Sequence, residues 1–373
     1  MIKRTRVRLL AAGAAALVSG ALWPALAHAQ TTEIVLGAML PLTGPAANIG
    51  LQQQNGVEFA VARINAAGGI RGQKVRMVYE DTQGKPDLGV AAFNRLVDLH
   101  KVPAILTAYS SVTLAVAPLA TRRKVLVINP AAQSNSLANA SPYLVNTIPL
   151  VKDEVSVIAK YAAEKIGKRA AILYENAAVG IDIRDEFKKA FTAAGGTIVA
   201  DEAIEFGSTN VRPSLLKIAA AKADFMFTGV TSGPGVVTEQ IASIPSLPIS
   251  VGTSFFVSLI GLPVAAGWYH SAVKSSVSPE TEKAFIAKFN TKDMPFFSRE
   301  YADASEILFK VINQGMQKGG PISGDGLKTT LFEMKTFDSF SGKLSFEGNT
   351  AKRDIEIFKL TPPGRTLVQA AQN

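Results

Sequence analysis

The sequence predicts an α/β protein of two domains, each built on a parallel sheet flanked by helices. From Glu33 onward, short apolar runs alternate with segments of helical periodicity. Repeated β-α-β units of this length form parallel sheets with right-handed crossovers. The alternation breaks at residues 144–149 and then restarts, which indicates a second unit of the same architecture. With 47% hydrophobic residues, the 373-residue chain is long enough to bury two cores.

The first 29 residues predict a cleavable signal peptide. Residues 1–8 are basic, residues 9–26 are apolar but interrupted by glycines and Pro24, and residues 27–29 (AHA) form a small-residue cleavage pattern before Gln30. A membrane anchor is the alternative, because the apolar run is nearly long enough to span a bilayer. Pro24 and the missing stop-transfer charges favour cleavage. The chain has no cysteine, so we expect no lipid anchor and no disulfide, and a soluble protein in a bacterial periplasm.

Removal of this leader also lowers the net charge. The formal charge is +9, and the leader holds Lys3, Arg4, Arg6 and Arg8, so 9 − 4 = +5 remains on 373 − 29 = 344 residues. The densest basic run, residues 122–124, falls at the end of an expected helix, where the helix dipole favours cations. No stripe of basic and aromatic residues is present, and we expect no nucleic-acid partner.

In both domains, the expected strands are short apolar runs and the expected helices carry apolar residues at three- and four-residue spacing. The first series comprises strands at 34–40, 75–80, 104–106 and 125–128 and helices at 51–67, 87–101 and from 112. The second series comprises helices at 152–165, 181–194, 211–221 and 236–243 and strands at 169–174, 197–206, 225–228 and 249–251. A strand near 268–275, helices at 279–290, 299–318 and 326–334, and strands at 342–346 and 354–360 around a turn at Gly348-Asn349 complete the chain.

The stretch from residue 104 to 120 carries the strongest sign of a binding site. A buried strand is followed by the polar turn Tyr109-Ser110-Ser111, and a helix begins at Val112. We expect Ser110 or Ser111 to cap that helix. A helix N-terminus beside spare hydroxyls favours anions, and open α/β sheets bind ligands at the carboxyl ends of their strands. An ordinary N-cap without a ligand is the alternative.

Three motifs resemble a known family when they are taken in order behind a signal peptide. They are GAMLPLTG at residues 37–44, NAAGGIRG at residues 65–72 and EDT at residues 80–82. This pattern is similar to the type I solute-binding proteins of ABC importers, and specifically to the leucine/isoleucine/valine-binding family, whose members also serve amides, urea and aromatic acids. The resemblance covers essentially the whole mature chain. It implies two Rossmann-like lobes joined by a three-strand hinge.

The resemblance also implies domain boundaries. The chain crossings would lie near residues 147–150, 266–271 and 337–342. Lobe 1 would contain residues 31–148 and 271–337, lobe 2 would contain residues 149–270 and 338–365, and residues 366–373 would form a tail.

Carried over by position, the family's ligand hydroxyl falls on Ser110, and the residues after the next strand fall on Ala132, Gln133 and Ser134. The first lobe would grip a ligand carboxylate through hydroxyls and amides. The second lobe would close over it with loops 175–180, 230–233 and 253–256. The candidate ligand-binding residues are Thr43, Gly44, Tyr109, Ser110, Ser111, Thr113, Ala132, Gln133, Ser134, Glu175, Val179, Thr231, Ser232, Thr253, Ser254 and Phe255.

The sequence departs from relatives that bind α-amino acids. Those relatives often have an aromatic residue where Val179 stands, and they supply a carboxylate to the ligand ammonium near residues 252–254, which hold no acid here. Glu175 is either a substitute for that acid or a solvated loop residue. Nearby rings that are candidates for ligand contact are Tyr109, Phe255, Phe256, Trp268 and Phe296. We therefore expect a carboxylate ligand with an apolar or aromatic body and no obligatory amine.

Residues for catalysis are absent from the expected mature sequence. Only His100 and His270 remain, cysteine is missing, and no zinc-protease, Walker A or nucleophile-elbow motif occurs. We expect no enzyme activity, no cofactor and no metal site. The expected function is capture of a small molecule in a cleft between the lobes and transient delivery to an ABC permease by a monomer. The alternative is a soluble sensor that presents the same ligand to a receptor.

Overall fold

The first sheet contains the four strands predicted for the first series, together with one from residues 342–347 and three that were not predicted, at residues 144–146, 336–339 and 350–352. In this computed structural model, which describes residues 33–339 and 342–370, the sheet has eight strands in the order β11-β12-β13-β5-β4-β3-β1-β2. The strands are β1 (Ile34–Leu40), β2 (Val75–Asp81), β3 (Ala104–Leu106), β4 (Leu126–Asn129), β5 (Leu144–Asn146), β11 (Thr336–Ser339), β12 (Gly342–Glu347) and β13 (Thr350–Lys352). The expected signal peptide lies outside the described residues.

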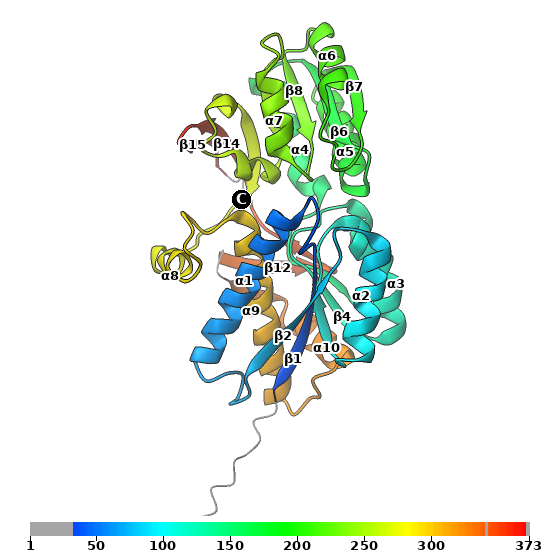
Figure 1. Cartoon of the computed structure of the whole chain (residues 1–373), viewed down its shortest axis with the longest axis vertical. Coiled ribbons are helices and arrows are strands. Elements are labelled where there is room, and N and C mark those ends of the chain that lie inside the picture. The colour runs from blue at the N-terminus through cyan, green and yellow to red at the C-terminus, as the bar shows by residue number, and fades with distance from the viewer. Residues whose placement is uncertain (1–32, 340–341, 371–373) are drawn as a thin grey trace, which may run out of the picture. The chain divides into compact units, whose positions relative to one another are not determined.

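Helices cover both faces of this sheet (Figure 1). They are α1 (Ala47–Ala66), α2 (Pro86–Asp98), α3 (Ser110–Arg123), α8 (Pro279–Phe289), α9 (Phe296–Gln317) and α10 (Gly324–Met334). One apolar core lies under α1 and α9 and includes Val57 and Leu308, and the other lies under α2 and α3 and includes Phe93 and Val116. This first lobe is thus a doubly wound unit, with burial on both faces of its parallel strands.

The second sheet repeats this plan with seven strands in the order β15-β14-β10-β9-β8-β6-β7. Its strands are β6 (Arg169–Glu175), β7 (Thr197–Ile204), β8 (Phe225–Gly229), β9 (Ser250–Gly252), β10 (Tyr269–Val273), β14 (Ile355–Thr361) and β15 (Gly364–Gln369). Its helices are α4 (Val151–Lys165), α5 (Ala178–Ala193), α6 (Arg212–Ala220) and α7 (Pro234–Ala242). Two 3₁₀ segments, η2 (Ser254–Leu259) and η3 (Pro263–Ala265), follow β9, and η1 (Asn135–Asn139) follows β4.

Both sheets have a point where the strand order reverses. In the first sheet β1 lies between β2 and β3, and in the second β6 lies between β7 and β8. The loops that follow β1 and β3 therefore diverge, as do those that follow β6 and β8, and such points hold the ligands of open α/β sheets. Residues from loops of both sheets line the same cavity.

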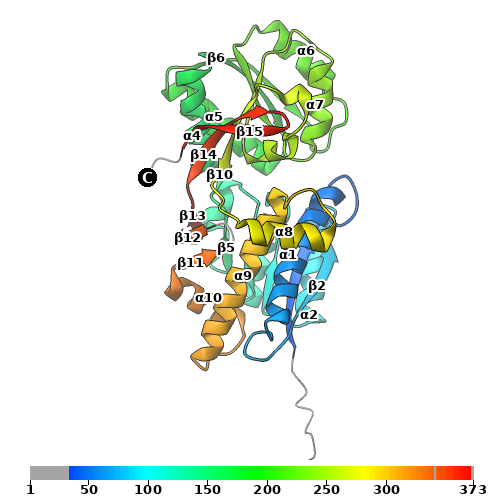
Figure 2. The same cartoon turned by 90° about the vertical axis from the view of Figure 1, so that its left-hand side faces the viewer.

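The C-terminal part of the chain differs from the expected arrangement. Strand β12 pairs with β11 and β13, in the first sheet, whereas β14 pairs with β10 and β15 in the second (Figure 2). The turn at Gly348-Asn349 is present, but it joins β12 to the three-residue strand β13. The two predicted strands, 342–346 and 354–360, thus lie in different sheets.

Two predicted boundaries change as a result. The chain leaves the first sheet for the last time after Lys352, not at 337–342, so residues 342–352 belong to lobe 1. Residues 364–369 form β15 and pair with β14, so they belong to the second sheet rather than to a free tail. Alternating hydrophobicity identified β12 and β14, but it carries no information on which edge of which sheet each strand joins.

Candidate ligand-binding cleft

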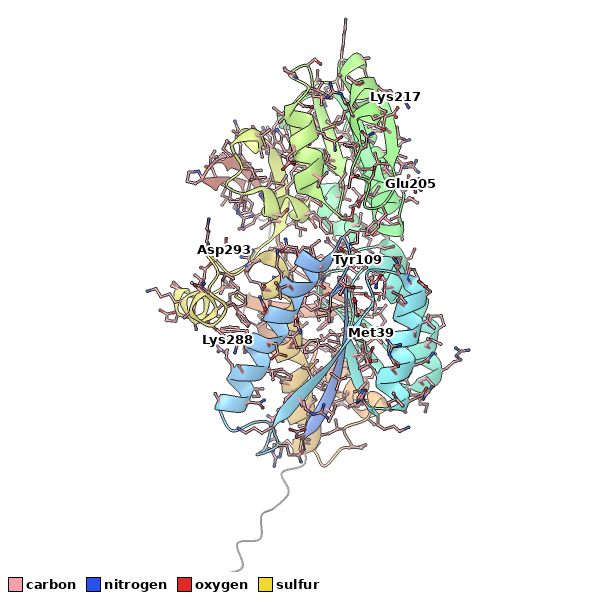
Figure 3. All side chains as sticks on the ribbon, viewed as in Figure 1. Met39, Tyr109, Glu205, Lys217, Lys288 and Asp293 are labelled. Atoms are coloured by element: carbon pink, nitrogen blue, oxygen red, sulfur yellow. The ribbon has the colours of Figure 1, made fainter. Side chains whose placement is uncertain are left out.

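A cavity is lined by loops and helix starts at the carboxyl ends of both sheets. The space between its wall atoms, including the part that opens to solvent, is about 360 Å³. Its lining from the first lobe comprises Ile49, Gln53, Tyr109, Ser110, Ala131, Ala132, Gln133 and Phe297, and from the second lobe Val179, Thr231 and Phe255. In Figure 3, Tyr109 lies where the two lobes meet.

The turn after β3 forms one wall of this cavity. Helix α3 begins at Ser110, and its N-cap is Tyr109, whose side chain makes no capping hydrogen bond. The predicted serine cap is therefore wrong, because both serines lie inside the first turn. Tyr109 has φ +64, a backbone conformation that is uncommon for a bulky residue and often occurs at functional sites. The first amides of α3 are left without a side-chain partner, which suits an anion.

Ser110 faces the loop after β4. Its Oγ accepts a hydrogen bond from the Ser134 backbone N–H at 3.2 Å, and no acceptor for its own O–H occurs among the described residues. The loop is held by Asn129, whose amide bonds both the N–H and the carbonyl of Ala132, at 2.8 and 2.6 Å. Ser110 therefore keeps one donor for a ligand oxygen.

Gln133 is anchored by a buried carboxylate that the sequence analysis did not single out. Glu154, in the first turn of α4, accepts four hydrogen bonds: from Gln133 Nε2 (2.8 Å), Ser254 N (2.6 Å), Ser254 Oγ (3.0 Å) and Ser271 Oγ (2.8 Å). A carboxylate offers about four acceptor sites, so Glu154 is saturated. It joins a first-lobe loop to the second lobe, and it engages the predicted Ser254.

Glu175 is buried and equally saturated. Its carboxylate accepts hydrogen bonds from the N–H and hydroxyl of Thr231, both at 2.7 Å, and from the N–H and hydroxyl of Ser232. The solvated-loop alternative for Glu175 is therefore wrong. The side chain fixes the loop after β8 and so sets the position of Thr231 in the cavity wall, whereas Ser232 bonds Glu175 outside that wall.

Contacts across the cleft tie the lobes together at its rim. Asp182 of α5 accepts hydrogen bonds from the Ser134 hydroxyl and, at 2.8 Å, from the Asn135 N–H. The Tyr109 and Phe206 rings meet edge to face, with 5.7 Å between centroids. These contacts join the two lobes beside the cavity.

Several predicted residues lie outside the cavity wall. Thr43 and Gly44 are exposed, and the Thr43 hydroxyl bonds Asp81. Thr113 turns back into its helix and donates to the Tyr109 carbonyl at 2.8 Å. Ser111, Ser134 and Thr253 are also absent from the lining.

Of the candidate rings, Tyr109 and Phe255 line the cavity. Phe256 and Trp268 pack against each other in the second-lobe core, and Phe296 lies in a separate apolar cluster. The lining residues that were not foreseen are Ile49, Gln53, Ala131 and Phe297.

Within the described ranges, no helix combines the length and apolarity needed to cross a membrane. In the same part of the chain, histidine, aspartate and glutamate side chains form no group of three that would hold a metal ion.

Comparisons with known proteins agree with this architecture. A Leu/Ile/Val-binding protein, BraC3 of Rhizobium johnstonii, is 28% identical over 356 residues, which cover 93% of this chain and 95% of the relative. A solute-binding protein of an ABC transporter from Rhodopseudomonas palustris BisB5, solved with 3,4-dihydroxybenzoic acid, superimposes with a TM-score of 0.81 at 24% identity, over 91% of this chain and 98% of that one.

The branched-chain amino acid transporter substrate-binding protein LivJ of Streptococcus pneumoniae, solved with isoleucine, gives a TM-score of 0.79 at 23% identity, over 91% of this chain and all of that one. The family model described as periplasmic binding protein matches residues 33–364. The chain therefore belongs to the periplasmic binding protein family.

Proposed function

We propose that this protein captures a small carboxylate with an apolar or aromatic body and delivers it to an ABC permease. The observation that carries the proposal is the start of α3 at the cavity wall, where first-turn amides and the Ser110 hydroxyl remain available for an anion. The rest of the wall supplies an apolar surface from Ile49, Val179, Phe255 and Phe297. Groups suited to an anion and an apolar surface thus occur in one site.

The buried acids argue against a ligand with an obligatory ammonium. Glu154 and Glu175 both use their oxygens on protein donors, and residues 252–254 hold no acid. Burying a ligand ammonium group without a protein carboxylate to pair with it costs several kcal/mol. This is a large share of the binding free energy of a micromolar complex, roughly 8 kcal/mol. Among similar proteins, one was solved with 3,4-dihydroxybenzoic acid and another with isoleucine. The saturation of both acids favours the aromatic acid.

The proposed mechanism is closure around the ligand. The ligand docks on the first lobe at Ser110 and Gln133, and Val179, Thr231 and Phe255 then cover it from the second lobe. Ligand binding stabilises the closed arrangement because both lobes contact the ligand only there. The protein would be exported by its signal peptide, which is cleaved after Ala29. The monomer in its closed form would then meet the permease.

Calorimetric titration with benzoate, leucine and isoleucine tests the ligand class. We expect micromolar or tighter binding of an aromatic acid and weaker binding of both amino acids. Tight leucine binding with no measurable binding of any aromatic acid would refute the proposal. Uptake of the bound acid by vesicles containing the cognate permease, absent without this protein, tests delivery.

A further inference from the structure

Two polar atoms that line the cleft have no hydrogen-bond partner among the described residues. They are Oε1 of Gln53 and the hydroxyl of Tyr109, and both atoms are buried. The Gln53 residue is only 2% exposed. Buried polar groups in native proteins almost always have a partner, so each such atom requires an explanation. Both residues line the same cavity, so an occupant of that cavity is a candidate source of the missing partners.

Gln53 is held in this wall by the packing of α1. The carbonyl of Gln52 accepts a hydrogen bond from the Ser298 hydroxyl at 2.7 Å, and at Gly56 a Cβ would come within 2.2 Å of the Ser298 carbonyl oxygen. Helix α1 therefore lies in direct backbone contact with the start of α9. This contact fixes the part of α1 that carries Gln53.

The Tyr109 ring is fixed in a similar way. It packs edge to face on Phe206 and lies beside Gly84, where an added Cβ would be 3.7 Å from the ring. Burial, and then the negative charge of Glu175, raise the pKa of the Tyr109 phenol above its ordinary value. The phenol is therefore neutral, and it can both donate and accept a hydrogen bond.

The two atoms together fit a hydroxyl group. An amide oxygen only accepts, so the ligand must donate to Gln53, whereas the phenol is able to donate to a ligand acceptor. A neutral ligand hydroxyl suits either atom, since it donates once and accepts as well. A ligand with a hydrocarbon side chain or an unsubstituted ring would leave both atoms buried without hydrogen-bond partners. Such a ligand should therefore bind more weakly.

We propose that the ligand is a hydroxylated aromatic carboxylate, whose hydroxyl is recognised by Gln53 and Tyr109. This inference rests on the proposed function, which assigns the carboxylate to the start of α3. It adds a selectivity between acids of the same size, because a site built to bond a hydroxyl discriminates strongly against an analogue that lacks it.

The test compares ligands of matched size on the full mature protein. Calorimetric titrations use 3- and 4-hydroxybenzoate, the corresponding methylbenzoates and benzoate. We expect at least one hydroxybenzoate to bind about ten-fold or more tightly than the methylbenzoate with the same substitution. The variants Gln53→Leu and Tyr109→Phe should each reduce that ratio to within about three-fold. Gln52→Leu, one position away on α1 and outside the cavity lining, should keep the wild-type ratio.

The outcomes separate this inference from the proposed function. Equal affinities for the hydroxy and methyl acids in the wild type would overturn the hydroxyl inference, because water would then satisfy both atoms, and would leave the carboxylate site standing. Absence of binding by every acid would overturn both. The ligand comparison on the wild type decides the question even if one variant does not fold, and thermal unfolding of each variant reports that directly.

Discussion

Glu154 and Glu175 each accept hydrogen bonds from four protein donors beside the cleft. Acids in a binding cleft are commonly assigned to the ligand, yet these two organise the loops that carry the lining residues. Glu154 orients Gln133 and Ser254, and Glu175 orients the turn at Thr231. Their oxygens are engaged by protein donors, so we expect ligand selection to depend on the neutral groups Ser110, Gln53 and Tyr109.

Replacement of Ser110 by alanine tests the proposed anion site at the residue scale. The variant loses the one hydroxyl of the cavity wall that lies in the first turn of α3, and a hydrogen bond to a charged oxygen contributes about 1–3 kcal/mol. We expect benzoate affinity to fall roughly 5- to 150-fold in calorimetry. Ser111→Ala, one residue along and outside the wall, is the control and should bind normally. Equal affinities of both variants and the wild type would remove Ser110 from the site.

His270 makes stability depend on pH in the acid range. It is buried on β10, where Nδ1 lies 2.8 Å from the Ser271 carbonyl, Arg365 faces Nε2 at 3.5 Å and Phe358 stacks on the ring. Burial first, then the charge of Arg365, lower the pKa of His270 to about 3. The unfolded chain takes up its proton near pH 6.5, so stability present above that pH is lost as the pH falls toward 3.

The expected loss is on the order of 4 kcal/mol over that interval. Urea unfolding of the wild type and of His270→Asn between pH 7 and pH 3.5 checks it, because the variant should show a shallower acid decline. His100→Asn, on an exposed residue, should follow the wild type. Parallel curves for His270→Asn and the wild type would contradict the assignment.

At the scale of elements, periodicity located most helices and strands within a few residues, because a continuous apolar run or a three-to-four spacing depends on local burial. The pairing of β12 and β14 could not be predicted in the same way. Both strands alternate, and the edge that each joins depends on partners elsewhere in the chain, such as β11 and β10. The start of α3 was also misjudged, since Tyr109 adopts a backbone conformation that its residue type disfavours.

Of the residues that line the cavity, Ser110 was predicted from its place after a strand, whereas Gln133 was expected from the family resemblance. Gln53 was missed because it lies among three consecutive glutamines of an amphipathic helix, a pattern typical of a solvated face. Glu154 was missed because an acid in the first turn of a helix has an ordinary explanation in the helix dipole. Neither residue carries a local signal, because the loops that each contacts come from distant strands.

The packing of α1 on α9 gives a prediction at this scale. Gly56→Ala would bring a Cβ within 2.2 Å of the Ser298 carbonyl oxygen, so the two helices must separate. We expect a loss of about 1–3 kcal/mol in the free energy of unfolding, measured in urea. Gly235→Ala in α7 meets no atom within 4 Å and should leave stability unchanged or raise it by up to about 1 kcal/mol. Equal stability of Gly56→Ala and the wild type would show that the helices adapt without cost.

At the scale of the whole molecule, the lobes are joined by three chain crossings and by the rim contacts of Asp182. The crossings follow β5, β10 and β13, and they allow hinge motion because few residues link the sheets. Asp182 of the second lobe accepts hydrogen bonds from Ser134 and Asn135 of the first lobe, and these bonds would hold the proposed closed form. Under the proposed closure mechanism, we expect ligand affinity to include a share that comes from contacts between the lobes themselves.

Asp182→Ala should weaken ligand binding without touching the cavity wall. Loss of its two hydrogen bonds destabilises the closed arrangement, and we expect roughly a ten-fold rise in Kd, mostly through faster dissociation. Stopped-flow measurement of ligand release checks this expectation. Asp185→Ala, an exposed neighbour on α5 that pairs with Arg184, is the matched control. An unchanged release rate for Asp182→Ala would exclude the rim contact from closure.

The late return of the chain to the second sheet has a consequence for how the protein folds. Neither lobe is encoded by one uninterrupted stretch, because β13 joins β5 through the Asn146–Thr350 hydrogen bond, 204 residues apart, before β14 completes the other sheet. Closing so long a loop is entropically unfavourable, and chains rich in such distant pairings fold slowly. Folding of both halves is therefore coupled to the arrival of the same C-terminal strands, and a nascent chain that lacks them has two incomplete sheets with exposed edges.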